Sequence, residues 1–562
     1  MAVTDNFASS ILDFNGEVSL SQPTALVWGP DGRLYVTEVD GDVKVLSVAF
    51  GDKTPGDSDP TAQFYVTAAT TLSEVRDIQN YDDNGAPNNS PNPNNDANKR
   101  QITGIDVTKQ FNASGEQLFV ASDGSLTTDA NGGLNPPAVT MYVTSSDSRI
   151  GAGGSGADEG LDTNSGVITK LTQTGIDDWD AVDIVRGLPR SEENHATNGL
   201  EVVQELDGSG NLVSERLIVA SGGNANTGAP SNNFAGQEEQ PLSAAILEVD
   251  LDAIKALSVN TDANGRQYVV DLVTLDDPTR PNANGITDPN DPGYDGVDAG
   301  VDYAGGNDSL NSAKLNYGDI VSIYSSGYRN SYDVEVTEDG RVWTYDNGAN
   351  NTWGGRPVGE AGGNGGTNGS NDTVDNPQLP GYIATNLNNG EGNTNDDINL
   401  INWNPSNSDN FHEVTRSDDL DGRTLSSGGF AQATTYVGPD GKTYVYGGHP
   451  NPTRAEGALA GMLFSPDAGT DNAYLLVSSQ NSYGMDGGRN PSNLSDYDRV
   501  IAFLAGVEAN DAEFPDSGIF GADTGDLTKK VLSVDPGVTY DIYSFADGSG
   551  AAVVAGSAAP AG

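Results

Sequence analysis

Histidine is the residue type in this chain that most directly suggests chemistry, because only three are present: His195, His412 and His449. An imidazole with an ordinary pKa of about 6.5 can act as a general base at neutral pH without a large shift. His195 lies in the polar segment GLPRSEENHATNGLEV, Gly187–Val202. Its ring could take a proton from a substrate hydroxyl, or it could donate to a loop carbonyl as structural support. The residues alone leave both roles open.

The pair Arg329–Asn330, in the phrase GYRN, is the second candidate. The chain has 27 Lys and Arg against 81 Asp and Glu, so an arginine at the start of a predicted strand is conspicuous. A guanidinium binds a carboxylate through two parallel hydrogen bonds, which suits an acidic cofactor. The alternative is an ion pair with one of the many acidic side chains of the protein, and the sequence does not decide between them.

An acidic loop, DPNDPGYDGVD, is the third candidate. Calcium binds about six to eight oxygen ligands, and a loop rich in Asp and Gly can supply them. The spacing and terminal Glu of an EF-hand are missing, so this would be another kind of calcium site, and the alternative is a solvated loop. The phrase DGSGN at Asp207–Asn211 is better interpreted as a β-turn than as a calcium loop. The predicted metal ligands are Asp288, Asn290, Asp291, Asp295 and Asp298.

The charge of the chain restricts its partners. The formal charge is 27 − 81 = −54, and such a surface repels the phosphates of nucleic acids and of anionic membranes. Self-repulsion of this size destabilises a compact fold unless salt or bound cations screen it. We therefore expect high-salt or calcium-rich surroundings. The absence of cysteine excludes disulfides and thiolate sites.

Two further features bear on location. The segment Met1–Gln22 has neither the basic start nor the continuous apolar core of a Sec signal peptide. No apolar run approaches the roughly 18 residues that a membrane helix requires. Together with the charge, these features favour an extracellular or cell-surface protein that is exported without an N-terminal Sec signal and does not insert into the membrane.

A short sequence pattern that is typical of a β-hairpin repeats along the chain. The hairpins that it forms must position the candidate residues. A turn containing Asp-Gly or Ser-Gly precedes a short strand of alternating β-branched, aromatic and aliphatic residues. Such turns are a strong hairpin signal because both central residues tolerate positive φ. Repeated use of one hairpin unit is typical of a β-propeller, so we predict an all-β fold of this kind. The five copies are Gly29–Glu38, Ala113–Ser122, Asp207–Ser221, Thr337–Asp346 and Gly438–Gly448.

Additional strands and long insertions lie between these copies. Strand-like runs occur at Ala138–Ser146, Ser165–Gln173, Ser243–Leu251, Asp319–Gly327 and Ala473–Ser479. One short helix is predicted at Leu251–Val259, and the insertions are rich in Asn, Gly and Asp. No internal linker divides the chain, so we expect one domain over residues 15–510. An N-terminal arm of residues 1–14 precedes it, and a strand segment with a low-complexity tail, residues 511–562, follows it.

Five groups of segments, in the same order along the chain, resemble the glucose/sorbosone dehydrogenase family. They are Pro23–Leu46, then Gly187–Val202 with Leu217–Pro230 and Leu242–Leu251, then Ser325–Asn350, Asn395–Ile401 and Tyr446–Gly457. The soluble members of that family are six-bladed β-propellers that use pyrroloquinoline quinone (PQQ) and calcium. The resemblance therefore implies a six-bladed propeller with long Asn/Gly/Asp-rich loop insertions.

The resemblance also implies roles for the first two candidates. His195 would take the proton from the anomeric hydroxyl of a sugar while a hydride passes to the quinone. In this chain Asn198 stands where the family has a glycine, three residues after the histidine. Arg329 and Asn330 match the family motif whose arginine and asparagine contact the quinone, and Arg329 would also stabilise developing oxyanion charge.

Other cofactor contacts implied by the resemblance are Gln101, His449 and Arg454. Gln101 lies in RQITGIDV, where the family often has a polar residue ahead of a glycine-containing strand. His449 and Arg454 lie in GGHPNPTRAEG, which replaces an aromatic phrase of the typical enzymes. The late paired arginines of the family have no counterpart after Gly457.

Two functional hypotheses follow. The first is an exported, calcium-binding propeller that resembles the PQQ-dependent aldose dehydrogenases and oxidises a sugar C1 hydroxyl or an aldehyde hydrate. The second is a propeller that keeps the scaffold without the chemistry, as a surface, matrix or adhesion module that self-assembles or binds a surface polysaccharide. The ordered central motifs favour the enzyme. The missing arginines and the extreme acidity favour the second hypothesis, and fold alone does not decide.

Overall fold

The structure is a computed structural model of the chain. It describes most of the segment from residue 12 to residue 346 and, beyond it, seven β-strands. The described residues are 12–14, 16–51, 63–82, 86–88, 100–150, 160–224, 234, 242–272, 320–326, 328–338 and 340–346, together with 411–413, 434–437, 443–446, 459–467, 472–478, 530–535 and 538–544.

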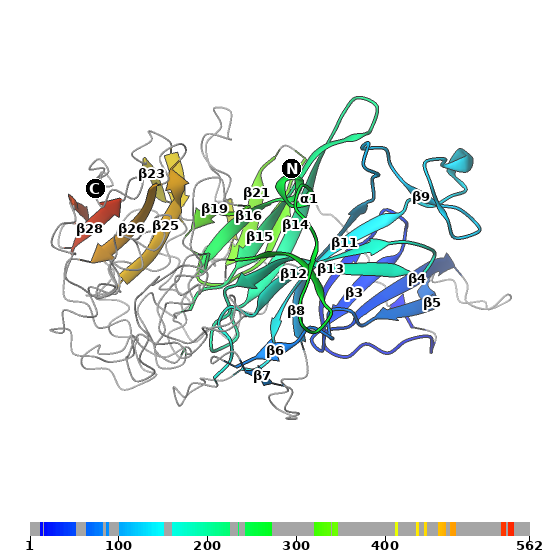
Figure 1. Cartoon of the computed structure of the whole chain (residues 1–562), viewed down its shortest axis with the longest axis horizontal. Helices are drawn as coiled ribbons and strands as arrows, with labels where there is room; N and C mark the ends of the chain where they lie inside the picture. Colours follow the sequence, from blue (N-terminus) through cyan, green and yellow to red (C-terminus); the bar gives the residue numbers. More distant parts are fainter. Residues whose placement is uncertain are drawn as a thin grey trace, which may run out of the picture.

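The first two sheets are mainly antiparallel meanders, in which each strand pairs with the next one along the chain (Figure 1). The first sheet consists of β2 (Pro23–Trp28), β3 (Leu34–Glu38), β4 (Val43–Gly51) and β5 (Gln63–Leu72), with β1 (Leu12–Asp13) parallel to β5. The second consists of β8 (Arg100–Lys109), β11 (Val139–Asp147), β12 (Gly166–Gln173) and β13 (Trp179–Leu188), extended by β18 (Gln267–Asp271) and β17 (Asn260–Thr261).

The next two sheets repeat this plan. The third consists of β14 (Thr197–Leu206), β15 (Leu212–Ser221), β16 (Ala245–Asp250) and β19 (Val321–Ser326), continued by β24 (Thr443–Tyr446) and β23 (Thr434–Val437). The fourth consists of β20 (Ser331–Val336), β21 (Val342–Asp346) and β22 (Phe411–Glu413). A separate sheet near the C-terminus contains β25 (Leu459–Asp467), β26 (Asn472–Ser478), β28 (Val538–Ser544) and β27 (Lys530–Asp535). Two small ribbons pair β6 (Asn80–Tyr81) with β7 (Pro87–Asn88) and β9 (Phe119–Val120) with β10 (Leu126–Thr127).

The predicted hairpin turns form because a glycine takes the left-handed backbone position that other residues avoid. Gly32, Gly210 and Gly340 have φ of 81°, 83° and 80°, in the turns that connect β2 to β3, β14 to β15 and β20 to β21. These three hairpins are confirmed, as is the pairing of β23 with β24 around the fifth phrase. The remaining strand-like runs are also confirmed, as β11, β12, β16, β19 and β26.

The copy at Ala113–Ser122 forms its turn but adds no strand to a large sheet. Gly115 has a φ of 81°, and Phe111 and Gln117 form an antiparallel bridge across the turn. Only the two residues of β9 are strand, and they pair with β10 outside the large sheets. Leu118 N–H donates across the turn to Gln110 O at 2.8 Å, and Val120 N–H donates to Pro136 O at 2.9 Å. The phrase therefore forms a short hairpin after β8, and the residues beyond the turn pair with Pro136 and β10 instead of a large sheet.

Adjacent sheets pack through apolar faces. Tyr35 and Val45 of the first sheet share one core with Ile105 and Met141 of the second. Ile218 of the third sheet shares another with neighbours in the fourth. The first strands of the four sheets, β2, β8, β14 and β20, contact one another in chain order. The sheets therefore stand side by side, with their first strands at the shared edge.

The described part of the chain is almost entirely β. Its helical elements are the short α1 (Leu251–Lys255) and one 3₁₀ turn at Asn131–Gly133. The Asp250 side chain accepts from Ala253 N–H at 2.8 Å and begins α1, which is shorter than the predicted helix. None of the helices in this part of the chain has the length and apolar content that crossing a membrane requires. The all-β class is as expected, while closure into six blades stays a prediction.

Candidate active site

His195 lies in the loop between β13 and β14, and its side chain is 1% exposed. Its Nδ1 is 2.8 Å from the carbonyl oxygen of Gly223. A carbonyl only accepts, so Nδ1 carries the proton in this contact and Nε2 holds the lone pair of the neutral ring. The structure thus contains the hydrogen bond to a loop carbonyl that was one of the two predicted roles. This bond also fixes the orientation of the ring and leaves Nε2 as the ring atom that could accept a proton.

Arg329 and Asn330 lie in the short connection between β19 and β20, and both are buried. A single carboxylate organises their backbone. Asp346, at the end of β21, accepts from Asn330 N–H at 2.8 Å and from Arg329 N–H at 3.3 Å. The two side chains are thus presented from a fixed turn at the start of the fourth sheet.

The structure brings these two predicted segments together. Gly223 joins them, because its carbonyl accepts from His195 while its N–H donates to the Arg329 carbonyl at 2.7 Å. Gly222 lies between them: a Cβ at that position would be 2.7 Å from both the His195 Cβ and the Asn330 Oδ1. Only glycine leaves room for this approach. Three stretches that are far apart in the sequence therefore meet at one point.

Phe234 packs against both functional groups. Its ring centroid is 4.8 Å from that of His195, and the Arg329 Cζ lies 5.9 Å from the same ring. The phenyl ring is fully buried. The imidazole and the guanidinium therefore share an apolar neighbour. This neighbour lowers the local dielectric constant and strengthens the electrostatic interactions of both groups.

Asn198 provides a direct hydrogen-bond bridge. Its Nδ2 donates to Asn330 Oδ1 at 2.9 Å and to Ser331 O at 2.8 Å. This residue stands where the glucose/sorbosone dehydrogenase motif, which this segment resembles, has glycine. The departure from the family pattern therefore has a structural effect, because the amide ties the start of β14 to the start of β20.

Arg190 organises the loop that carries His195. It is completely buried, and its guanidinium donates to five backbone carbonyls. Three of these carbonyls belong to the His195 loop itself, including that of His195 at 3.2 Å and that of Glu193 at 2.5 Å. The loop folds around this guanidinium because one group with several N–H donors can satisfy many inward-facing carbonyls at once.

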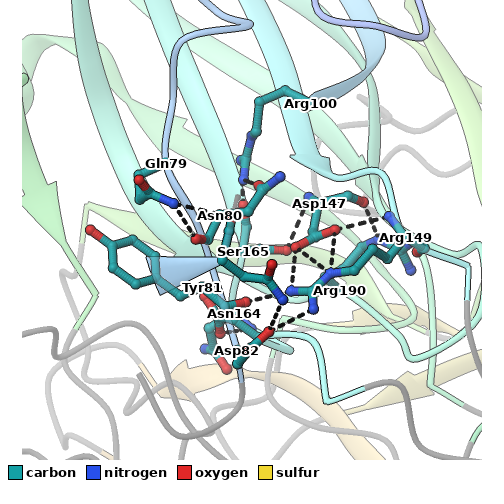
Figure 2. Close-up of polar contacts among 12 residues, drawn as sticks. Gln79, Asn80, Tyr81, Asp82, Arg100, Asp147, Arg149, Asn164, Ser165 and Arg190 are labelled. Carbon is teal, nitrogen blue, oxygen red and sulfur yellow. Dashed lines mark hydrogen bonds and ion pairs between the residues drawn. The ribbon is translucent and has the colours of Figure 1, made fainter. Parts of the chain in front are cut away.

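A second arginine supports the same loop. Figure 2 shows Arg149 between two carboxylates, with Nη2 2.8 Å from Asp147 Oδ2 and Nη1 2.7 Å from Asp82 Oδ1. The Asp147 and Arg149 carbonyls in turn accept from Arg190, at 3.1 and 2.6 Å. The polar network therefore extends from the edge of β11 to the His195 loop.

Two acidic side chains affect the charge near this site. Burial raises the pKa of Glu193, while Arg190 and Arg329 act in the opposite direction. Its buried Oε2 has no hydrogen-bond partner among the described residues. On β14, burial and the nearby Asp106, Glu335 and Asp333 raise the pKa of Glu201 to about 8. Glu201 therefore keeps its proton at neutral pH, which limits negative charge where β8, β14 and β20 meet.

The other predicted contacts are not joined to this centre. Gln101 is half-buried on β8, opposite Ser146, and no described contact connects it to His195 or Arg329. His449 and Arg454 lie outside the described residues. So do the predicted calcium ligands Asp288, Asn290, Asp291, Asp295 and Asp298.

One acidic cluster that the sequence analysis overlooked could bind a metal ion. Carboxylate oxygens of Glu38, Asp40 and Asp42 lie within 4.8 Å of one another. Lys44 Nζ is 3.2 Å from Glu38 and 3.0 Å from Asp42, and Arg76 is 2.9 Å from Asp42. Calcium would have to compete with these cations, so the donor set fits calcium only in part.

The donor set around His195 fits part of a PQQ molecule. A buried guanidinium can hold a carboxylate in bidentate geometry, and the Asn330 amide can orient a neighbouring polar group. Arg190 cannot add a second cationic contact, because its donors are bound to carbonyls. Arg329 and Asn330 would therefore hold one edge of the tricarboxylate, and further contacts would have to come from elsewhere in the chain.

Comparisons with known proteins show only weak similarity. No family model and no curated protein matches the chain. Solved structures that resemble it include a Thermus thermophilus protein assigned as an oxidoreductase (glucose dehydrogenase), with 12% identity and a TM-score of 0.19, covering 58% of this chain and 91% of that one. Another is the calcium structure of a Trichoderma reesei member of Carbohydrate-Active Enzymes Family AA12, with 14% identity and a TM-score of 0.20, covering 59% and 74%. Both TM-scores are too low for either likeness to bear on the function of this chain.

Proposed function

We propose that this chain is a PQQ-dependent oxidoreductase of the sugar dehydrogenase type, which oxidises the C1 hydroxyl of an aldose. The observation that carries the proposal is the convergence of His195, Arg329 and Asn330 through Gly222 and Gly223. The family resemblance assigns these three residues to one site, and they come from segments more than 130 residues apart in the chain.

The proposed reaction divides the work between cofactor and protein. PQQ, when bound, supplies the acceptor for the hydride that leaves C1. His195 Nε2 takes the proton of the C1 hydroxyl, and the Gly223 carbonyl stabilises the resulting imidazolium through Nδ1–H. Arg329 would bind a carboxylate of the cofactor and stabilise the negative charge that develops on the C1 oxygen as its proton leaves. Asn330, held by Asn198, orients the group beside it.

The wider setting of this site is part of the same proposal. The four sheets with adjacent first strands would be consecutive blades of a six-bladed ring that spans residues 15–510. An arm would precede the ring, and a strand segment with a tail would follow it. Bound calcium would offset part of the −54 charge. The protein would act outside the cell or at its surface, on a small sugar or aldehyde.

A second function is favoured by one observation, the burial of the site. His195 is 1% exposed and Arg329 is fully buried. A base must reach its substrate, and a side chain that is covered on all sides serves packing equally well. The second candidate is therefore a non-catalytic propeller of an extracellular surface or matrix, in which the same residues stabilise the junction of the third and fourth sheets.

Titration with PQQ separates these functions. With calcium present, the absorbance of PQQ should change to saturation at one equivalent per chain. Arg329→Lys keeps the charge but loses the bidentate geometry, so the affinity should fall about tenfold or more. Arg216→Lys, on the exposed side of β15, serves as the control and should bind as the wild type does. A folded wild-type protein that leaves the PQQ spectrum unchanged would contradict the enzyme and leave the scaffold function.

A further inference from the structure

A cavity lies between the second and third sheets, on parts of the molecule that the proposed reaction does not use. Its volume is about 620 Å³. Its walls come from the end of β8 and the following turn, from β11 and β12, from β15, and from α1. The polar lining side chains that matter here are Lys109, Lys170, Lys255, Glu215 and Tyr142.

The charge of this cavity is opposite to that of the protein. Three lysines line it, and Glu215 is the one carboxylate among its lining residues. Lys255 is already neutralised, because its Nζ lies 3.0 Å from Glu215 and 2.8 Å from Asp252. Gln204 also donates to the second oxygen of Glu215, at 3.1 Å. Glu215 also hydrogen-bonds to the Tyr142 side chain, so it is committed to Lys255, Gln204 and Tyr142, and Lys109 and Lys170 remain as cations facing the cavity.

Lys170 is the central residue of this cavity. It is half-buried on β12, with its Nζ 5.9 Å from the centroid of the Tyr142 ring. Within the described part of the chain, no carboxylate lies within ion-pair distance of this ammonium. Burial lowers the pKa of Lys170, with Glu215 acting against this shift and Lys255 adding to it. A partly desolvated ammonium without a counterion gains from any anion that enters.

The walls hold the cavity open in one shape. The turn after β8 is fixed to β15, because Leu212 N–H donates to Gly115 O at 2.9 Å. A Cβ on Gly115 would approach the Leu212 carbonyl to 2.7 Å, so this contact is close and specific to glycine. Tyr142 is almost fully buried and forms a rigid base under Lys170. Ligand binding would therefore carry no entropic cost for ordering a loop.

We propose that this cavity binds a small anion that carries a carboxylate or a phosphate group, with Lys170 as the main contact and Lys109 as the second. A metal cation is excluded by the lysines, and a neutral ligand would leave Lys170 without a counterion. The net charge of the whole chain does not prevent this, because at physiological salt the Debye length is about 8 Å and distant carboxylates are screened. The site is independent of the sugar dehydrogenase proposal.

Isothermal titration at low ionic strength with two probes, inorganic phosphate and citrate, tests this inference. At least one probe should bind saturably at one equivalent per chain. Lys170→Met should weaken it about tenfold or more, since a hydrogen bond to a charged group is lost. Lys170→Arg, which keeps the charge, should retain most of the affinity. Lys530→Met, in β27 of a different sheet, removes the same charge and should bind as the wild type does.

The outcomes are distinguishable. Binding of phosphate alone assigns a phosphorylated ligand, binding of citrate alone assigns a carboxylate, and binding of both supports a general anion site. Absence of saturable binding by both probes would overturn the inference. So would an equal loss of affinity in Lys170→Met and Lys530→Met, because the effect would then come from total charge. Thermal melting of Lys170→Met shows whether the variant is folded.

Discussion

The His195 centre and the cavity lined by Lys109, Lys170 and Lys255 both contain buried or half-buried basic side chains in a strongly acidic protein, but they are built in opposite ways. At the His195 centre the protein itself binds many of the polar groups: Arg190 binds five carbonyls, and Gly223 binds both His195 and Arg329. At the cavity, Lys170 faces open volume without an ion pair among the described residues. The first is rigid and closed, and the second is open and incompletely neutralised.

The two regions are therefore suited to different tasks: the His195 centre holds side chains in position, and the cavity binds a ligand. Groups that are fully bonded to the protein hold a geometry, but a ligand must displace something to reach them. Charged groups that are desolvated and not neutralised can bind a ligand of opposite charge without first breaking contacts within the protein. A catalytic function for the His195 centre therefore requires access for a substrate, whereas the cavity needs no rearrangement.

The largest effect is expected from Arg190→Met. The substitution removes five buried hydrogen bonds from the guanidinium to backbone carbonyls, so the free energy of unfolding should fall by about 3–5 kcal/mol. Chemical denaturation monitored by tryptophan fluorescence measures this. The control is Arg216→Met, whose exposed ion pair with Glu248 should cost less than about 1 kcal/mol. Equal losses in the two variants would show that Arg190 does not organise the loop.

A smaller effect, of opposite sign, is expected from Lys170→Met. The pKa of this lysine is lowered in the folded protein, so its charged form destabilises the fold at neutral pH. Removing the charge while keeping most of the apolar stem should therefore raise the free energy of unfolding at pH 7.

The difference in stability between Lys170→Met and the wild type should also depend on pH. The wild type becomes more stable as pH rises from the folded pKa of Lys170 towards the unfolded value of about 10.5, so the advantage of the variant should shrink over that range. Paired denaturation curves from pH 7 to pH 10 measure the difference. A loss of stability in Lys170→Met at pH 7 would mean that its ammonium is well compensated, and the contrast between the two regions would fail.

Local features of the fold were predictable because they depend on neighbouring residues. The alternation of strands such as β15 and the Asp-Gly turn before β21 are visible in short windows of sequence, and the structure has both. The segment Ala113–Ser122 shows the limit of this approach. Its turn forms as expected, but Val120 N–H bonds to Pro136, which lies well beyond the phrase, and β9 pairs with β10 outside the large sheets.

The candidate site was predictable only where a residue type carries chemistry by itself. His195 and Arg329 stand out because histidine and arginine are scarce in this chain. Phe234 and Gly223 were missed, because an apolar ring and a backbone carbonyl acquire a role only when the fold brings them to the histidine. Arg190 could have been suspected, since it is a basic residue five positions before His195 in an acidic chain.

The most direct test of the proposed active site is dye reduction by the purified protein, loaded with PQQ and calcium, in the presence of glucose and other aldoses. The wild type should reduce the dye, and His195→Ala should lose about 10²–10⁴-fold in rate, because the general base is gone. His412→Ala, on β22, is the matched control and should keep the wild-type rate. Protein that has bound PQQ but reduces no dye with any aldose, or that is unaffected by His195→Ala, would contradict the account.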